Sequence, residues 1–199
     1  MNDVDTQQDQ PVAYNYSFKP SLMGVPHEFD LTADAFRWRL AGREGTIPYR
    51  NIRRVRLSFR PINLQTYRFL MEIWSDDAPR LQVASTSWRS VVEQTRQDAP
   101  YTAFVTAFHE RLAAAGSEAL FESGRPPLVY WPGLVLFLGL ALGLAYIVVR
   151  SLQESSLAAF ALVAGVFVLL LWQIGNMFRR NRPGRYRPDA IPRHVLPGG

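Results

Sequence analysis

The fold of this chain is decided by LVYWPGLVLFLGLALGLAYIVV, Leu128–Val149, and LAAFALVAGVFVLLLWQIGNM, Leu157–Met177. The first run has 22 residues without a charge, and the second has 21, of which only Gln173 and Asn176 are strongly polar. At a rise of about 1.5 Å per residue, either run as a helix crosses a hydrocarbon core of about 30 Å. Because only seven residues separate them, we expect a transmembrane helical hairpin over residues 128–177.

The positive charge of the chain belongs to its membrane end. Residues 1–125 hold 15 Lys and Arg against 15 Asp and Glu, whereas residues 126–199 hold 7 Arg against 2 acidic residues, and 7 − 2 gives the net charge of +5. A nucleic-acid-binding domain would carry its charge on the folded part, so this pattern argues against nucleic acid as a partner. The absence of cysteine excludes disulfides, thiolate nucleophiles and cysteine metal sites.

The topology follows from the flanks of the hairpin. Residues 1–13 are acidic and amide-rich, so we expect them to be disordered rather than to act as a signal peptide. Five arginines follow the second run directly, and by the positive-inside rule they place both termini in the cytoplasm. Two roles are open for these arginines. They either only fix the topology and contact anionic headgroups, or they form a tail that binds a partner. The five residues are Arg179, Arg180, Arg182, Arg185 and Arg187.

Residues 14–115 show two periodicities. About seven short segments alternate apolar and polar residues, most clearly Ile52–Phe59, which predicts strands. A helical pattern follows, with Asp98 as the expected N-cap and Gly116 as the stop. Its apolar residues fall on one face: Tyr101, Phe104, Val105, Phe108 and Leu112.

This order of elements predicts an α+β domain that is mainly β, a bent antiparallel sheet or partial barrel capped by the C-terminal helix. The layout, together with FDLTAD (29–34), FRW (36–38) and GTIPYRNI (45–52), resembles bacterial membrane proteins that carry a pleckstrin-homology-like (PH-like) domain. The resemblance implies a PH-like domain over residues 14–115 and a multi-pass protein of the bacterial inner membrane. It supplies no catalytic residues to carry over.

Two connecting regions complete the predicted organisation. Residues 116–127, rich in Gly, Ser, Glu and Pro, are expected to form a semi-flexible linker. Residues 178–199, with the five arginines and a proline-rich end, are expected to form a flexible cytoplasmic tail.

Arginines on the strands around residues 52–74 form the first candidate binding site. Arginine suits bidentate contact with phosphate, and some domains of the resembled fold bind phosphorylated lipid headgroups. The alternative is a solvated strand face that discourages edge pairing. The candidate residues are Arg54, Arg56, Arg60, Arg68 and Trp74.

Small residues in the hairpin form the second candidate. Gly139 and Gly143 make a G-x-x-x-G step, and Ala161 and Gly165 repeat the small-residue spacing in the second run. Such steps allow close helix packing, and the partner is either the other arm of the hairpin, a second copy of the chain, or another membrane protein.

Catalytic signals are weak. His27, His109 and His194 are isolated, with no spacing typical of a metal site, and no phosphate-binding glycine loop is present. We therefore expect no enzyme, cofactor or metal, but a membrane-anchored interaction or scaffolding module with a membrane-protein partner or a homo-oligomer. The alternatives are an accessory or assembly subunit of a larger membrane complex, and a domain that senses anionic lipid headgroups.

Overall fold

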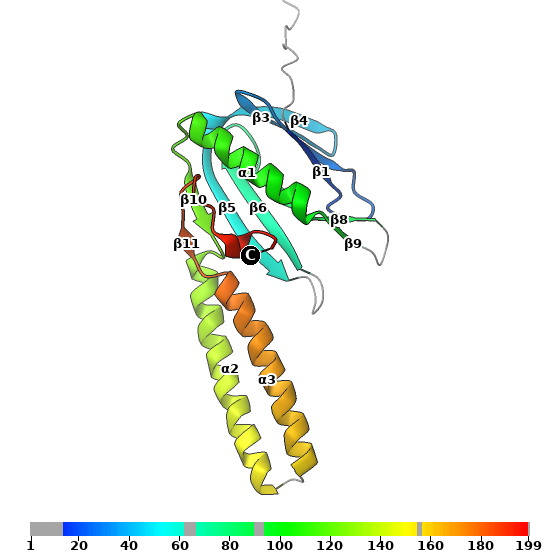
Figure 1. Ribbon diagram of the computed structural model, residues 1–199, viewed down its shortest axis with the longest axis vertical. Coiled ribbons are helices and arrows are strands. Elements are labelled where there is room, and N and C mark those ends of the chain that lie inside the picture. The colour runs from blue at the N-terminus through cyan, green and yellow to red at the C-terminus, as the bar shows by residue number, and fades with distance from the viewer. Residues whose placement is uncertain (1–13, 62–66, 90–93, 155–156, 199) are drawn as a thin grey trace, which may run out of the picture.

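The computed structural model describes residues 14–61, 67–89, 94–154 and 157–198 and has an α+β fold (Figure 1). A sheet domain lies at one end, and two long antiparallel helices extend from it. The segment 1–13, which the sequence predicts to be disordered, lies outside the described residues.

The first sheet is an antiparallel meander of four consecutive strands. Its core-facing residues alternate with exposed ones, as in β2, where Phe29 and Leu31 are buried and Asp30 between them is not. Ala41 and Gly42, both with positive φ, form the two-residue turn between the third and fourth strands. The strands are β1 (Tyr14–Phe18), β2 (His27–Leu31), β3 (Ala35–Leu40) and β4 (Arg43–Pro48).

The second sheet has the order β11-β10-β5-β6-β7, reached through the short 3₁₀ helix η1 (Tyr49–Asn51). Three strands form the antiparallel run predicted from the sequence: β5 (Ile52–Pro61), β6 (Tyr67–Ser75) and β7 (Leu81–Ala84). The other two come from segments that were not predicted as strands: β10 (Leu120–Ser123), parallel to β5, and β11 (Gly184–Arg185). A separate hairpin, β8 (Thr86–Trp88) with β9 (Gln94–Arg96), precedes the domain helix.

Helix α1 (Asp98–Ala114) buries the predicted face, with Phe104 and Phe108 inserted among the aromatic rings of the first sheet. The Tyr16 and Phe104 ring centroids are 5.3 Å apart, and those of Phe36 and Phe108 are 5.2 Å apart. The expected N-cap was wrong by one residue, because Gln97 holds that position and Asp98 begins the helix. Gly116 follows the last turn with a φ of +62°, as the predicted stop requires.

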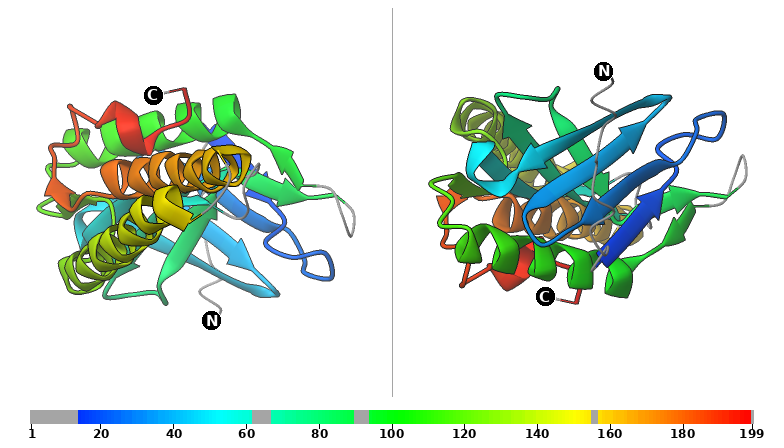
Figure 2. Two further views of the ribbon diagram at one scale, coloured as in Figure 1. Left: turned by 90° about the horizontal axis from the view of Figure 1, so that it is seen from below. Right: turned by 90° about the horizontal axis from the view of Figure 1, so that it is seen from above.

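The predicted linker and tail were wrong, because both pair with the sheet domain. Within 116–127, β10 extends β5, and Phe121 is buried. Within 178–199, β11 pairs with β10, and the 3₁₀ helix η2 (Arg193–Val195) buries Val195 completely. Figure 2 shows α1 and this C-terminal segment along the same side of the sheet domain. Segments of two to four residues are too short to show a periodic pattern, so only their distant partners reveal them.

The hairpin consists of α2 (Pro127–Glu154) and α3 (Leu157–Arg180), slightly longer than the predicted runs 128–149 and 157–177. Both are long and apolar enough to cross a membrane, over Pro127–Arg150 and Phe160–Arg180, and no residue of their most apolar windows is buried. The helices extend beyond the apolar runs because polar side chains at the ends do not interrupt the backbone hydrogen bonds.

Candidate functional site

Trp74 on β6 is the centre of an arginine cluster on the outward side of the second sheet. Along β5, Val55 and Leu57 are buried, whereas Arg54 and Arg56 alternate with them. Arg80 approaches from the residue before β7. The guanidinium carbons of Arg54, Arg56 and Arg80 lie 5.6, 5.3 and 5.9 Å from the Trp74 ring centroid, within cation–π range. We call these four residues the Trp74 cluster.

Two glutamates compensate the charge of the Trp74 cluster. Glu122 on β10 accepts from Arg56 at 2.5 Å and lies 4.0 Å from Arg54. Glu72, only 4% exposed, lies 3.7 Å from Arg80 and 3.4 Å from Arg60. The side chains of Arg54 and Arg80 nevertheless remain 43% and 53% exposed. The cluster can therefore offer outward guanidinium groups to a carboxylate or a phosphate without an uncompensated buried charge.

Arg68 does not belong to the Trp74 cluster, although the sequence grouped it there. It points into a hollow of about 60 Å³ shared with Phe18, His27 and Trp88. Its Nε is buried without a hydrogen-bond partner among the described residues, as is His27 Nδ1. Burial and the adjacent Arg60 lower the pKa of Arg68, and burial lowers the pKa of His27. The hollow holds little more than water, so it does not suit a larger ligand.

A wider groove lies beside the C-terminal end of α1. It measures about 530 Å³, and Asp34, Tyr49, Arg50 and Arg111 line it. Arg111 Nη1 donates to the Thr32 carbonyl at 3.2 Å, and the Tyr49 hydroxyl donates to the same carbonyl at 3.0 Å. Burial raises the pKa of Tyr49 to about 12, so this hydroxyl stays protonated. The groove is open and carries both signs of charge, and it offers no reactive group.

Sequence reasoning missed the junction between the sheet domain and the hairpin. His109 on α1 is fully buried, with Nδ1 2.7 Å from the Val105 carbonyl and Nε2 2.9 Å from the Tyr186 hydroxyl. Burial lowers the pKa of His109 to about 4, so the ring is neutral, with Nδ1–H as donor and Nε2 as acceptor. Burial also raises the pKa of Tyr186. In the sequence, His109 stood out only as an isolated histidine. In the structure its ring makes buried hydrogen bonds that join α1 to the C-terminal segment.

Gly124 and Asn181 hold the two ends of the hairpin together at this junction. Gly124 has a φ of +78°, and a Cβ there would lie 2.4 Å from the carbonyl oxygens of Asn181 and Arg182. The Gly124 amide donates to the Leu57 carbonyl at 2.8 Å, and the Arg125 amide donates to the Asn181 carbonyl at 3.0 Å. Only glycine permits this approach of two backbones.

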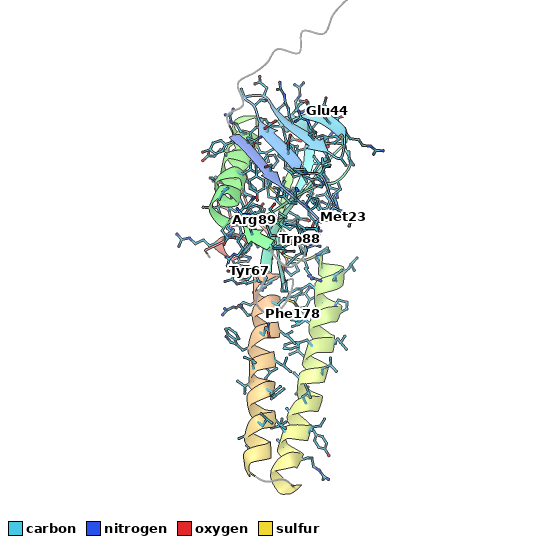
Figure 3. The ribbon with its side chains drawn as sticks, turned by 90° about the vertical axis from the view of Figure 1, so that its right-hand side faces the viewer. Met23, Glu44, Tyr67, Trp88, Arg89 and Phe178 are labelled. Carbon is cyan, nitrogen blue, oxygen red and sulfur yellow. The ribbon has the colours of Figure 1, made fainter. Side chains whose placement is uncertain are left out.

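The small-residue steps of the hairpin do not pack between its two arms. A Cβ at Gly139, Gly143 or Gly165 would meet no atom within 4 Å, and Ala161 is exposed. Of the three partners considered for these steps, the other arm of the hairpin does not pack against them. The arms instead meet near the sheet domain through Phe178, which lies between them (Figure 3) and contacts the rings of Tyr130 and Phe137 at 5.6 and 5.4 Å.

The five arginines after the second apolar run lie at the junction end of the hairpin. Arg180 stacks on Phe59 at 5.2 Å, and Arg179 donates to Asn176 at 3.1 Å. Arg182, Arg185 and Arg187 are exposed, with Arg185 in β11. Their position agrees with a role at a membrane surface, which stays a prediction.

Within the described residues, no group of three or more His, Asp or Glu side chains is placed to hold a metal ion. Comparisons of the chain with protein-family models, curated proteins and solved structures gave no match. The PH-like resemblance therefore stays a prediction.

Proposed function

We propose that this chain is a membrane-anchored interaction module of the bacterial inner membrane, in which a PH-like cytoplasmic domain is held at the bilayer by the hairpin and has no catalytic activity of its own. The observation that carries the proposal is the junction. The chain enters the hairpin from β10 and returns through β11, and these two strands pair with each other. The domain is thus mounted in one orientation rather than tethered by a flexible linker.

The PH-like assignment is supported by the order of elements. The resemblance implies about seven antiparallel strands followed by a closing helix, and β1 to β7 precede α1 in that order, with the short β8–β9 hairpin between them. The cytoplasmic position of both termini is supported by the tail arginines, since a hairpin returns the chain to its side of origin.

The Trp74 cluster is the proposed binding surface of this module. Tryptophan and arginine are the residues most enriched at interface hot spots, and here rigid strands hold them. Because the guanidinium groups outnumber the two glutamates, the surface suits a partner that presents carboxylates. A mounted domain raises the local concentration of this surface for partners in the same membrane.

The proposal is tested by affinity purification of the tagged full-length chain from its own membrane in mild detergent. We expect a stoichiometric partner that is lost with Arg54→Glu and Arg80→Glu, and retained with the matched pair Arg43→Glu and Arg50→Glu, which are exposed on the β4 side. The partner should also survive replacement of residues 128–177 by an unrelated hairpin that leaves β10 and β11 in place. A partner unaffected by the Trp74 changes would contradict the assignment of the surface.

A second candidate function, an accessory subunit of a larger membrane complex, is favoured by the open glycine faces. Gly139, Gly143 and Gly165 have room for a helix from another chain. This candidate predicts that the partner is lost when the hairpin is replaced, and also with Gly139→Leu and Gly143→Leu.

A third candidate, sensing of anionic lipid, is favoured by the loop between β1 and β2. Leu22, Met23 and Val25 are 38%, 97% and 53% exposed, and Met23 lies on the half of the domain nearer the hairpin (Figure 3). The Trp88 amide donates to the Lys19 carbonyl at 3.2 Å, which joins this loop to the β8–β9 hairpin. An exposed apolar tip in the loop that follows Lys19 suits a bilayer surface. Met23→Glu should then weaken contact of the domain with anionic vesicles in the full-length protein.

A further inference from the structure

Two adjoining hollows lie at the junction, and Arg125 lines both of them. The first, of about 250 Å³, has four charged residues in its lining, and we call it the polar hollow for that reason. It is bounded by Arg56, Glu122, Ser123, Arg125 and Arg185. The second, of about 210 Å³, lies between the ends of α2 and α3 and is bounded by Tyr130, Gly133, Phe178 and Asn181. The two hollows share Arg125, and together they have a basic side and an apolar side.

The basic side carries uncompensated charge. Of its three arginines, Arg56 is paired with Glu122 at 2.5 Å. Among the described residues, the side chains of Arg125 and Arg185 have neither an ion pair nor a hydrogen-bond partner. They come from different segments, the turn before α2 and strand β11, and the β10–β11 pairing brings them to one hollow. Two arginines without an ion-pair partner that line one hollow suit an anion with several oxygens, such as a phosphate.

The apolar side contains a buried polar atom that lacks a partner. Asn181 is 1% exposed, and its Nδ2 donates to the Met177 carbonyl at 3.1 Å. Its Oδ1 is buried and has no hydrogen-bond donor in the described part of the chain. Because a buried amide oxygen without a donor is costly, the polar groups of the junction are not fully satisfied by the described residues around them.

The position of the site relative to a bilayer identifies the source of the phosphate. The candidate span Pro127–Arg150 has 24 residues, or about 36 Å of helix, against a hydrocarbon core of about 30 Å. Its Pro127 end therefore reaches the headgroup layer, and Pro127 lines the polar hollow. The apolar hollow opens between the two helices one turn deeper, where the glycerol and acyl part of a lipid lies.

We propose that this junction binds one anionic phospholipid, its phosphate held by Arg125 and Arg185 and its apolar part held against Tyr130, Gly133 and Phe178. The lipid fills the seam where the hairpin meets the sheet domain. Arg56 and Glu122 line the polar hollow and also take part in the Trp74 cluster or its charge compensation. The two arginines proposed to hold the phosphate, Arg125 and Arg185, do not belong to that cluster, so their substitution tests the lipid site separately.

The test is native mass spectrometry of the delipidated full-length protein in mild detergent, with phosphatidylglycerol and phosphatidylcholine added at equal concentration. We expect one phosphatidylglycerol to be retained in preference to phosphatidylcholine. Arg125→Gln with Arg185→Gln should reduce this retention by roughly tenfold or more, since two charge-assisted contacts are lost. The matched pair Arg182→Gln with Arg187→Gln makes the same change in charge on exposed tail residues and should change retention less than about twofold.

Two further measurements separate a lipid from a free anion and from a folding defect. Gly133→Leu fills the apolar hollow, since a Cβ there already lies 3.6 Å from the Phe178 ring. It should abolish lipid retention while circular dichroism shows an unchanged fold. Competition by inorganic phosphate as effective as that of the lipid would overturn the proposal, as would equal retention of the two lipids or equal loss in both arginine pairs.

Discussion

The sheet domain and the helical hairpin are both rich in apolar side chains, but they use them in opposite ways. In the sheet domain Phe29, Phe36 and Phe108 are completely buried. In the hairpin Leu142, Leu162 and Trp172 are 73%, 71% and 70% exposed. The domain is therefore stabilised by its own core, whereas the hairpin leaves its apolar surface uncovered, as expected of helices that could cross a membrane. Substitutions in the sheet domain should therefore lower its free energy of unfolding much more than substitutions in the hairpin. Substitutions at the junction should have effects like those in the domain.

The largest expected difference is between a core ring and a hairpin leucine. Phe104→Ala removes a buried ring that contacts Tyr16 and Phe36, and should lower the free energy of unfolding of the sheet domain by about 3–5 kcal/mol. Leu142→Ala, at an exposed position, should lower it by less than about 0.5 kcal/mol. Urea titration in mild detergent, followed by near-ultraviolet circular dichroism, measures both. Equal losses would contradict the opposite use of the two apolar surfaces.

The junction glycine should come next. At Gly124, alanine meets both a left-handed φ and two carbonyl oxygens at 2.4 Å, so Gly124→Ala should cost about 3 kcal/mol. At Gly116 the φ is similar, +62°, but the space is open, so Gly116→Ala should cost only about 1 kcal/mol. The same titration, with proteolysis of the C-terminal segment as a second readout, compares them. If the two losses are equal, the hairpin ends are not packed against each other as described.

A pH dependence should follow from His109. Its pKa is about 4 in the folded protein and 6.5 when unfolded, so between these values only the unfolded chain binds the proton. The stabilisation is fully present above about pH 6.5 and is lost as the pH falls towards 4. At about 1.4 kcal/mol per pH unit, roughly 2 kcal/mol should be lost between pH 7 and pH 5.

The reference for this effect is His109→Gln, which cannot take up the proton. The difference in unfolding free energy between the two proteins should shrink as the pH falls, whereas the titration of carboxylates affects both alike. A difference that stays constant from pH 7 to pH 4.5 would mean that His109 is not buried in its neutral form.

The smallest effect on the isolated chain should come from the glycine faces of the hairpin. A Cβ added at Gly139 or Gly143 meets no atom within 4 Å, and leucine has the higher helix propensity, so we expect Gly139→Leu with Gly143→Leu to be tolerated. The unfolding free energy of the sheet domain should therefore stay within about 0.5 kcal/mol of the value for the unsubstituted protein. The helix content should not change within the error of the circular dichroism measurement. Loss of helix content would show that these glycines do pack between the two arms.

Local patterns predicted the elements whose signal is carried by neighbouring residues. Val55, Leu57 and Phe59 of the alternating run and the helical face from Tyr101 to Leu112 are buried as expected, whereas Ser58, on the opposite face of the strand, is buried as well. The outward position of Arg54 and Arg56 followed from the same alternation. Their compensation by Glu122 did not, because this acid lies 66 residues from Arg56 and reaches it only through the β10–β5 pairing.

The candidate sites divide in the same way. Trp74, Arg54 and Arg56 lie together as predicted, since strand pairing places them side by side. Arg68 lies apart from these three residues, half-buried in the hollow that it shares with Phe18, His27 and Trp88. The phospholipid site had no local signal, since Arg125 and Arg185 are unremarkable in a linker and a tail that show no periodicity.

The sequence alone determined two helices long enough to span a membrane, a positive charge concentrated at one end of them, the lack of thiol chemistry, and the strands and helix of the sheet domain. These follow from composition and from periods of 2 and 3.6 residues, which local sterics and burial impose. The tertiary structure decided that the hairpin closes onto the domain, that its glycines face outward, and which arginines have acidic partners. Each of these depends on contacts between segments far apart in the chain, and no local pattern specifies the register of such contacts.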